Sequence, residues 1–244
     1  MKKLNGVWWL IEECDLSMEH LYEKLDGLGV KKVTISNDIK EIPPHWFAFC
    51  KILKEVIIQS GTTTICDGVF QSCMALERVE IKEGLLEIRP NAFLNCPSLV
   101  EIAIPDSVIR IGEGAFHDCE SLKRIRIPSG VKILEYGLFE NCNSLEEVEL
   151  SEGLIIIQRG VFGNCRALKE IRIPKGTKDI RSAAFAGCKS LEEVIYPDGI
   201  LTVWGFTFRG CTSLKRVLIP YSVIDIQPGA TYECPQAKIY RYKN

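Results

Sequence analysis

The sequence predicts a repeat solenoid, in which the chain coils once per repeat and stacks successive laps into one elongated, mainly β domain. Three observations predict this fold class: one residue pattern recurs every 23 residues, each copy contains a short strand pattern, and a single copy cannot bury its own apolar side. Units of this kind are stable only when neighbouring copies share a continuous core. We therefore expect one domain of nearly identical laps.

Phenylalanine, cysteine and leucine mark the repeat. A phenylalanine recurs every 23 residues at Phe47, Phe70, Phe93, Phe116, Phe139, Phe162, Phe185 and Phe208. A cysteine follows three residues later in each copy, at Cys50, Cys73, Cys96, Cys119, Cys142, Cys165, Cys188, Cys211 and, without its phenylalanine, Cys234. A leucine comes three residues after most of these cysteines, from Leu53 to Leu214. The register continues unbroken over about 200 residues, so chance does not explain it.

Each repeat reads L-x-x-I-x-I-P-x-G-V-x-x-I-x-x-G-A-F-x-N-C-x-S. The alternation at its start predicts a strand, and the proline with the following glycine or serine predicts a turn. A second apolar pair, such as Val131 and Leu134, predicts a brief extended piece on the opposite wall. The Gly-Ala-Phe-x-Asn-Cys stretch is too short for a helix and predicts a tight turn. Strand centres are expected at Val33, Val56, Val79, Ile102, Ile125, Val148, Ile171, Val194, Val217 and Tyr240.

This pattern resembles the BspA-type leucine-rich repeat over about residues 30–242. The family pattern IPxxVxxIGxxAFxxCxxL is written out at residues 104–122. The resemblance implies a leucine-rich-repeat right-handed superhelix with a parallel sheet on its concave face and little helix. It also implies a bacterial protein used for binding, in many members at the cell surface or after secretion.

The two ends of the chain differ from the repeats. Residues 1–29 are expected to form an N-terminal cap, consisting of a short strand in the Val7–Ile11 stretch and an amphipathic helix over residues 16–27. Asp15 can cap this helix and Gly27 can end it. The repeats occupy residues 30–236, and residues 237–244 are expected to form an edge strand whose cationic side chains discourage pairing with another edge. Together these segments form a single domain.

The cysteine row lies between two apolar rows, so its side chains are expected to face inward. Cysteine behaves as a small hydrophobic residue and is often buried. Disulfides and a metal site stay open as less favoured alternatives, because stacked parallel side chains neither draw Cβ atoms together nor surround a tetrahedral ion. Cys66 lies in a different, largely polar row and is expected to be exposed.

Composition and charge narrow the function. The formal net charge of -2 disfavours nucleic acid as a partner, and no apolar run approaches the roughly 18 residues of a membrane-spanning helix, so membrane insertion is not expected. The apolar stretch Val7–Ile11 is too short for a secretion signal, which predicts a cytoplasmic protein as the sequence stands. A signal removed beforehand would instead indicate a cell-surface or secreted protein.

The sequence contains no recognisable group of catalytic residues. The three histidines, His20, His45 and His117, fall in unrelated rows, and the sequence has no phosphate-binding loop, metal motif or nucleophile triad. The protein is therefore expected to be non-catalytic, with no cofactor and no metal. A cation held by Glu147, Glu170 and Glu193 is the weaker interpretation of that acidic run, because calcium sites gather six or more oxygens.

Two groups of side chains are the candidate partner-binding residues. The first is a charged set on the strand face: Arg124, Arg126, Glu147, Glu149, Glu170 and Arg172. For any single one of these, a self-neutralised soluble face is the favoured interpretation, and a groove that selects a partner by charge is the alternative. The second is a C-terminal apolar and aromatic set: Ile195, Trp204, Phe206, Leu218 and Tyr221.

The aromatic set either packs together as part of the C-terminal cap or forms a contact patch for a partner. The function hypothesis is a non-catalytic scaffold for protein–protein interaction. The alternative is a bacterial surface adhesin that recognises host protein or glycan. The oligomeric state is left open.

Overall fold

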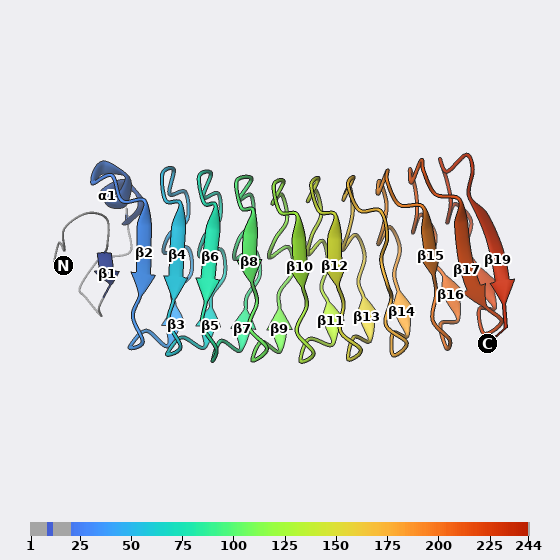
Figure 1. The fold of residues 1–244 in the computed structure, drawn as a ribbon, viewed down its shortest axis with the longest axis horizontal. Helices are drawn as coiled ribbons and strands as arrows, with labels where there is room; N and C mark the ends of the chain where they lie inside the picture. Colours follow the sequence, from blue (N-terminus) through green and yellow to red (C-terminus); the bar gives the residue numbers. More distant parts are fainter. Residues whose placement is uncertain (1–8, 12–20, 244) are drawn as a thin grey trace.

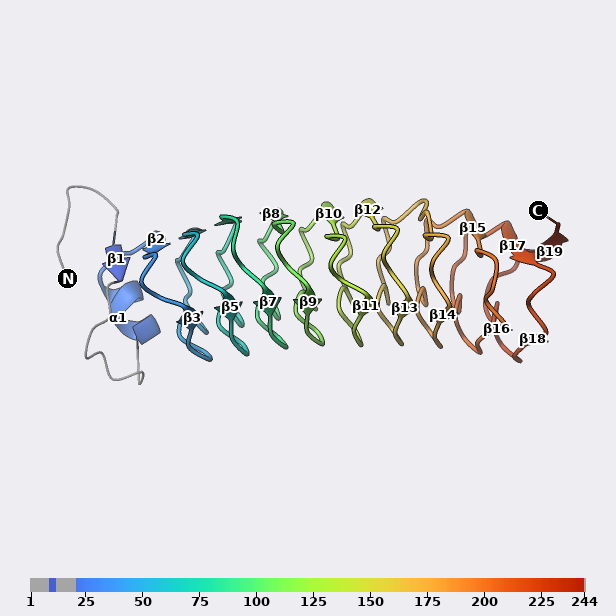
Figure 2. The ribbon, with the colours of Figure 1, turned by 90° about the horizontal axis from the view of Figure 1, so that it is seen from below.

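The computed structural model describes residues 9–11 and 21–243. Within them the chain forms a β-solenoid whose laps follow one another along a single long axis (Figure 1). Most laps contribute a longer strand to one wall and a two-residue strand to the opposite wall (Figure 2). The lap around Ile171, where a strand centre was expected, has only an isolated bridge from Glu170 to Glu193 on the first wall. The predicted fold class is confirmed.

The longer strands form the long-strand face in three consecutive sheets, and every hydrogen-bonded pair among them is parallel. Val33, Val56 and Val79 pair in register on three consecutive strands, which is the 23-residue spacing seen in space. Along this face lie β1 (Trp9–Ile11), β2 (Lys32–Ile35), β4 (Glu55–Ile58), β6 (Arg78–Ile81), β8 (Glu101–Ala103), β10 (Arg124–Arg126), β12 (Glu147–Glu149), β15 (Glu193–Ile195), β17 (Arg216–Pro220) and β19 (Lys238–Tyr242).

The opposite wall carries the second extended piece that the sequence predicts. Its strands are also parallel and keep the same spacing. They are β3 (Glu41–Ile42), β5 (Thr64–Ile65), β7 (Glu87–Ile88), β9 (Arg110–Ile111), β11 (Ile133–Leu134), β13 (Ile156–Ile157), β14 (Asp179–Ile180), β16 (Thr202–Val203) and β18 (Asp225–Ile226).

A tight turn returns the chain from the short strands to the long-strand face. Two backbone positions of this turn lie in the left-handed region in each lap, for example Asn91 and Asn95 at φ 57°. Such a conformation favours glycine and asparagine, which explains the Gly and Asn of the repeat. Between these positions the phenylalanine points inward. The eight rings stack with centroids 5.2–5.7 Å apart.

The nine cysteines of the repeat row are free and buried. From Cys73 onward, each thiol donates a hydrogen bond to the carbonyl of the phenylalanine in the preceding lap, at 2.8–3.2 Å. The cysteine is therefore more than the small apolar residue that the sequence predicts, because its S–H also pairs with a buried carbonyl oxygen.

Cys66 corrects one expectation. Its side chain is buried, with 3% of its surface exposed, instead of facing solvent. Long side chains elsewhere in its row, such as Arg89 and Gln158, are half-buried and reach outward. A side chain as short as cysteine stays below the surface there.

The N-terminal helix α1 spans Leu21–Gly27. Two backbone hydrogen bonds close it, from Gly29 to Asp26 and from Val30 to Leu25, with Gly29 at φ 69°. The predicted helix start and its Asp15 cap lie outside the described residues. β1 pairs with β2 and confirms the expected N-terminal strand.

The last strand corrects a second expectation. Val217 pairs with Ile239, 22 residues on, so Ile239 and not Tyr240 is the core residue of β19. Tyr240 pairs with Leu218 and is 45% exposed. One residue is missing between Cys234 and the strand, and a shift of one residue moves every side chain to the other face.

Candidate binding surfaces

The outward side chains of the long-strand face are mostly charged and pair between laps. Lys32 contacts Glu55 at 2.6 Å, and Arg78 contacts Glu101 at 3.0 Å. Arg126 lies 3.6 Å from Glu149 and also contacts Asp106 at 2.6 Å. Exposed pairs of this kind contribute under about 1 kcal/mol each. They keep this part of the face soluble and patterned in charge.

Not every pair of opposite charges in neighbouring laps of this face forms an ion pair. Arg124 and Glu147 occupy matching register positions, yet no ion pair joins them in the described part of the chain. Arg172 likewise has no ion pair with Glu149 among residues 21–243. Glu170 bridges Glu193 through the backbone, and Glu193 pairs with Arg216. The acidic run is thus partly neutralised at one end.

The same face becomes apolar toward the C-terminus. Ile195, Leu218 and Tyr240 stand in register on β15, β17 and β19 and point outward. Ile195 is 48% exposed, Leu218 is half-buried and Tyr240 is exposed. We call these three residues the apolar strip. The 23-residue spacing identified Ile195 and Leu218 as outward residues. It assigned Tyr240 to the core, because it did not account for the residue that is missing before β19.

The tight turns hold a separate aromatic contact. Phe206 lies edge-on to Tyr232 of the next lap, with ring centroids 6.4 Å apart. The guanidinium of Arg209 lies 5.8 Å from the centre of the Tyr232 ring. Phe206 and Tyr232 are both about half exposed. Sequence reasoning found Phe206 and missed its two partners, which only the stacking of laps brings together.

Trp204 and Tyr221 lie apart from this contact. The indole N–H of Trp204 donates to a carboxylate oxygen of Asp179 at 2.8 Å, and Trp204 is only partly exposed. Tyr221 follows β17 in the turn and is 65% exposed. The predicted set therefore comes from several elements of the C-terminal laps. Its members lie on the long-strand face, on the short-strand wall and at the turn between them.

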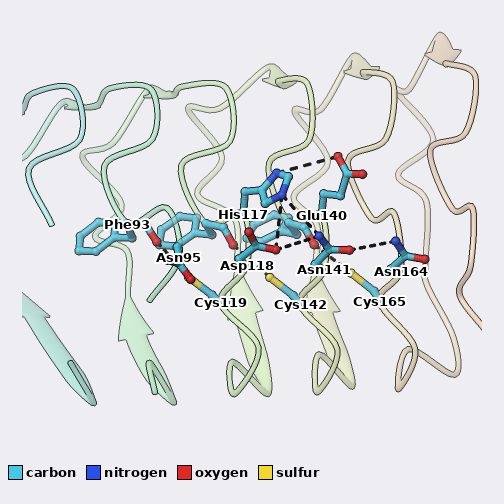
Figure 3. A network of polar contacts seen from close by, with 12 residues as sticks. Phe93, Asn95, His117, Asp118, Cys119, Glu140, Asn141, Cys142, Asn164 and Cys165 are labelled. Atoms are coloured by element: carbon cyan, nitrogen blue, oxygen red, sulfur yellow. Dashed lines mark hydrogen bonds and ion pairs between the residues drawn. The ribbon is translucent and has the colours of Figure 1, made fainter. Parts of the chain in front are cut away.

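A polar network crosses the tight turns of the central laps (Figure 3). The Asn164 side-chain amide donates to Asn141 at 2.9 Å, and the Asn141 amide donates to Asp118 at 2.8 Å. His117 lies 3.4 Å from Asp118 and 3.9 Å from Glu140. These contacts tie neighbouring laps together along the surface.

This network lacks a nucleophile. The nearest thiol, Cys119, is fully buried, and burial raises its pKa well above the usual range, so it stays protonated. Within residues 9–11 and 21–243, no group of histidine, cysteine, aspartate or glutamate side chains is arranged to hold a metal ion. The described residues also include no helix with the length and apolar character needed to span a membrane.

Comparison with known proteins extends the resemblance. The family model for the BspA type leucine rich repeat region matches residues 26–146 and 134–244, in six copies. A leucine-rich repeat protein from Bacteroides ovatus has 25% sequence identity and a TM-score of 0.83, covering 100% of this chain and 65% of its own. This chain thus spans slightly less than two thirds of that protein's length. Comparison with curated proteins gave no match.

Two further solved structures share the fold at lower similarity. A leucine rich cell surface protein from Faecalibacterium prausnitzii is 24% identical, with a TM-score of 0.51 over 88% of this chain and 79% of that one. The pneumococcal vaccine antigen PcpA is 19% identical, with a TM-score of 0.50 over 88% of this chain and 69% of its own. At this level of identity the likeness concerns the fold alone.

Proposed function

Since the chain belongs to the BspA-type leucine-rich repeat family, we propose that it is a non-catalytic scaffold that binds another protein through its long-strand face. Stacked parallel laps hold outward side chains on a rigid, extended surface. Such a surface positions many contacts at once with little loss of conformational entropy on binding. The predicted function therefore follows from the arrangement of side chains on this face.

The apolar strip carries this proposal. Of the sixteen large hydrophobic side chains that are exposed in the described part of the chain, eight lie in the segment from Ile195 to Tyr240. Three residues of that segment stand side by side on one face, next to laps whose equivalent positions hold Arg126 and Glu149. Contiguous exposed apolar side chains bordered by charge are typical of protein contact sites.

The charged laps supply selectivity. Arg124, Arg126, Glu147 and Glu149 present both signs of charge on adjacent strands. Complementary charges on a partner speed its approach and disfavour wrong partners, while adding little net affinity. Glu170 and Arg172 extend this charged area toward the strip. We assign binding energy to the apolar strip and orientation to these six residues.

Affinity capture from the native cell tests this assignment. The tagged protein is compared with a variant carrying Leu218→Ser and Tyr240→Ser. Ile109→Ser serves as the matched control, because Ile109 is an exposed aliphatic side chain on the other wall. The strip variant should lose the captured protein and the control should retain it. Equal capture by all three proteins would remove the strip as the binding site.

Recognition of glycan at a cell surface is a second candidate. Tyr221 offers a ring that is 65% exposed, and aromatic rings of this kind stack on sugar faces. The cell-surface description of the Faecalibacterium neighbour supports that location only through a shared fold. Labelling of intact cells with a reagent that does not cross membranes, followed by glycan binding of Tyr221→Ser, separates this candidate from the first.

A further inference from the structure

Among the described residues, β19 is the edge strand of its sheet on the long-strand face. β19 pairs with β17 on one side, and no other strand of the described residues covers its second edge. β19 is held firmly, because its five residues all pair with β17. The Tyr242 hydroxyl also donates to the Tyr196 carbonyl at 2.7 Å, and the Arg241 guanidinium donates to the Val223 carbonyl at 2.8 Å.

The backbone of β19 offers hydrogen-bonding groups at the open edge. The Lys238 N–H donates to the Lys215 carbonyl at 3.0 Å and thus faces β17. In a parallel sheet, successive residues alternate between the two neighbours. The backbone N–H and C=O groups of Ile239 and Arg241 therefore point away from β17, toward the open edge.

In one charged row of the long-strand face, the residue on β19 is the cation Lys238. On earlier laps one register row alternates in sign, with Lys32 beside Glu55 and Arg78 beside Glu101. Near the end of this row, Glu193 pairs with Arg216. Lys238 occupies the next position, beside Arg216, and makes no ion pair with a carboxylate of residues 21–243. An acidic residue on a further strand would lie beside Lys238 as Glu55 lies beside Lys32.

The apolar pattern also continues to the edge without a neighbour. Ile239 points inward and is only half-buried, whereas its register partner Val217 is fully buried. Tyr240 points outward at the end of the apolar strip. A further parallel strand would thus meet a cation, an inward apolar residue and an outward aromatic residue, in that order.

We propose that the open edge of β19 takes up an extended segment of a partner protein as an additional parallel strand. Opposite Lys238, Ile239 and Tyr240, this segment carries an acidic residue followed by two apolar residues. The inference rests on the proposed protein-binding function and names the kind of segment that is bound. The cations of β19 repel the same edge of a second copy and attract an acidic strand, so the charge selects the partner.

The probe is a synthetic peptide that copies Ser190–Pro197, which contains the Glu-Val-Ile pattern of β15. It carries a fluorophore and blocked ends, and its binding to the intact protein is followed by fluorescence anisotropy. A second peptide has lysine in place of both glutamates. The native protein should bind the acidic peptide and bind the basic one at least about five-fold more weakly, the scale of an exposed charge pair.

Two variants test the edge itself. Arg241→Pro removes one outward N–H, and proline is tolerated in an edge strand when its missing N–H faces solvent. Arg241→Ala is the matched control, because it loses the same side chain and keeps the N–H. The proline variant should bind about ten-fold more weakly than the alanine control, the scale of one lost hydrogen bond with its imposed backbone change. Lys238→Glu should reverse the preference between the two peptides.

The outcomes are decisive. Absence of peptide binding, or equal binding by the proline and alanine variants, would overturn the proposal. A third result would also overturn it: the double variant Lys238→Gln, Arg241→Gln self-associates and the native protein does not bind the peptide. In that case the cations would only prevent edge-to-edge pairing of two copies. If the peptide fails while native capture still depends on Leu218 and Tyr240, only the edge proposal falls. If the peptide binds while native capture does not depend on Leu218 and Tyr240, the proposal for the β19 edge stands and the apolar strip is refuted as the binding site.

Discussion

The central laps and the C-terminal laps of the solenoid share the same interior and differ outside it. From Phe93 to Phe185, inward rings and thiols repeat without change and the outward strand positions are mostly charged. From Ile195 onward, the ring stack continues to Phe208, while the outward row of Ile195, Leu218 and Tyr240 becomes apolar. Inward rows therefore determine the fold, and a change confined to an outward row is free to serve binding.

The tight turns show that the outward change carries a cost. The left-handed position that glycine occupies at Gly114, Gly137 and Gly160 is occupied by Phe206 in one C-terminal lap, at φ 60°, and again by glycine at Gly229. A residue with a Cβ atom loses about 1–2 kcal/mol in this conformation. The chain accepts that strain where the ring also contacts Tyr232. His45, Asn91 and Ala183 hold the same left-handed position in other laps, so this strain is not confined to Phe206.

The largest expected difference between the two regions concerns phenylalanine. Phe139 is fully buried between Phe116 and Phe162, so Phe139→Ala should destabilise the protein by about 3–5 kcal/mol. Phe206→Ala, at a half-exposed position, should lower the free energy of unfolding by under about 1 kcal/mol. Chemical denaturation measures both. Similar values would mean that the ring stack does not form the interior.

Cysteine should show the next largest contrast. Cys142 is fully buried and its thiol donates to the Phe116 carbonyl at 3.2 Å. Cys142→Ala removes volume and leaves that carbonyl one donor short, which should cost about 1–3 kcal/mol. Cys234→Ala lies on the last lap, where the surroundings can relax, and should cost less. The same denaturation experiment compares them, and a reversed order would contradict the buried ladder.

Substitutions at the left-handed turn position should affect stability differently in the two regions, by about 1 kcal/mol in the free energy of unfolding. Gly137→Ala places a Cβ atom at φ 57° and should destabilise the central laps by about 1 kcal/mol. Phe206→Gly relieves the same strain and loses one ring contact, so its stability should stay within about 1 kcal/mol of the native protein. Thermal unfolding resolves the pair. A strong loss of stability in Phe206→Gly would assign that ring to the core.

Surface charge should matter least. Arg78 and Glu101 are more than half exposed, so Arg78→Ala should change the free energy of unfolding by under about 1 kcal/mol, and less at high salt. Denaturation at two salt concentrations tests this. A large effect that salt does not reduce would show that the charged face supports the fold.

Much of the fold could be predicted because the repeat imposes it. The spacing of Phe116 and Cys119 fixes which side chains stack, and stacking one lap fixes all the others. Prediction failed where a single residue changed the geometry. Because one residue is missing before β19, Ile239 points inward and Tyr240 outward, the reverse of the expectation. Cys66 is buried because its side chain is too short to reach the surface from its row.

The candidate site was less predictable than the fold. Sequence rows identify outward positions, but they do not reveal that Trp204 pairs with Asp179 or that Phe206 meets Tyr232. Those contacts depend on the conformations that long side chains adopt across neighbouring laps. The strand-face residues Ile195 and Leu218 were found because strand alternation alone determines where they point.

Alkylation of the native protein, resolved for each cysteine by mass spectrometry, tests the contrast between a closed middle and an open C-terminal end most directly. Burial raises the pKa of Cys188 to about 12, whereas a hydrogen bond with Cys211 lowers the pKa of Cys234, which lies in the last lap and is 9% exposed. Among the nine thiols of the repeat row, Cys234 should therefore react first, and Cys188 should react only on unfolding. Equal labelling of both, or fewer than eleven reactive thiols in denaturant without reductant, would contradict the account.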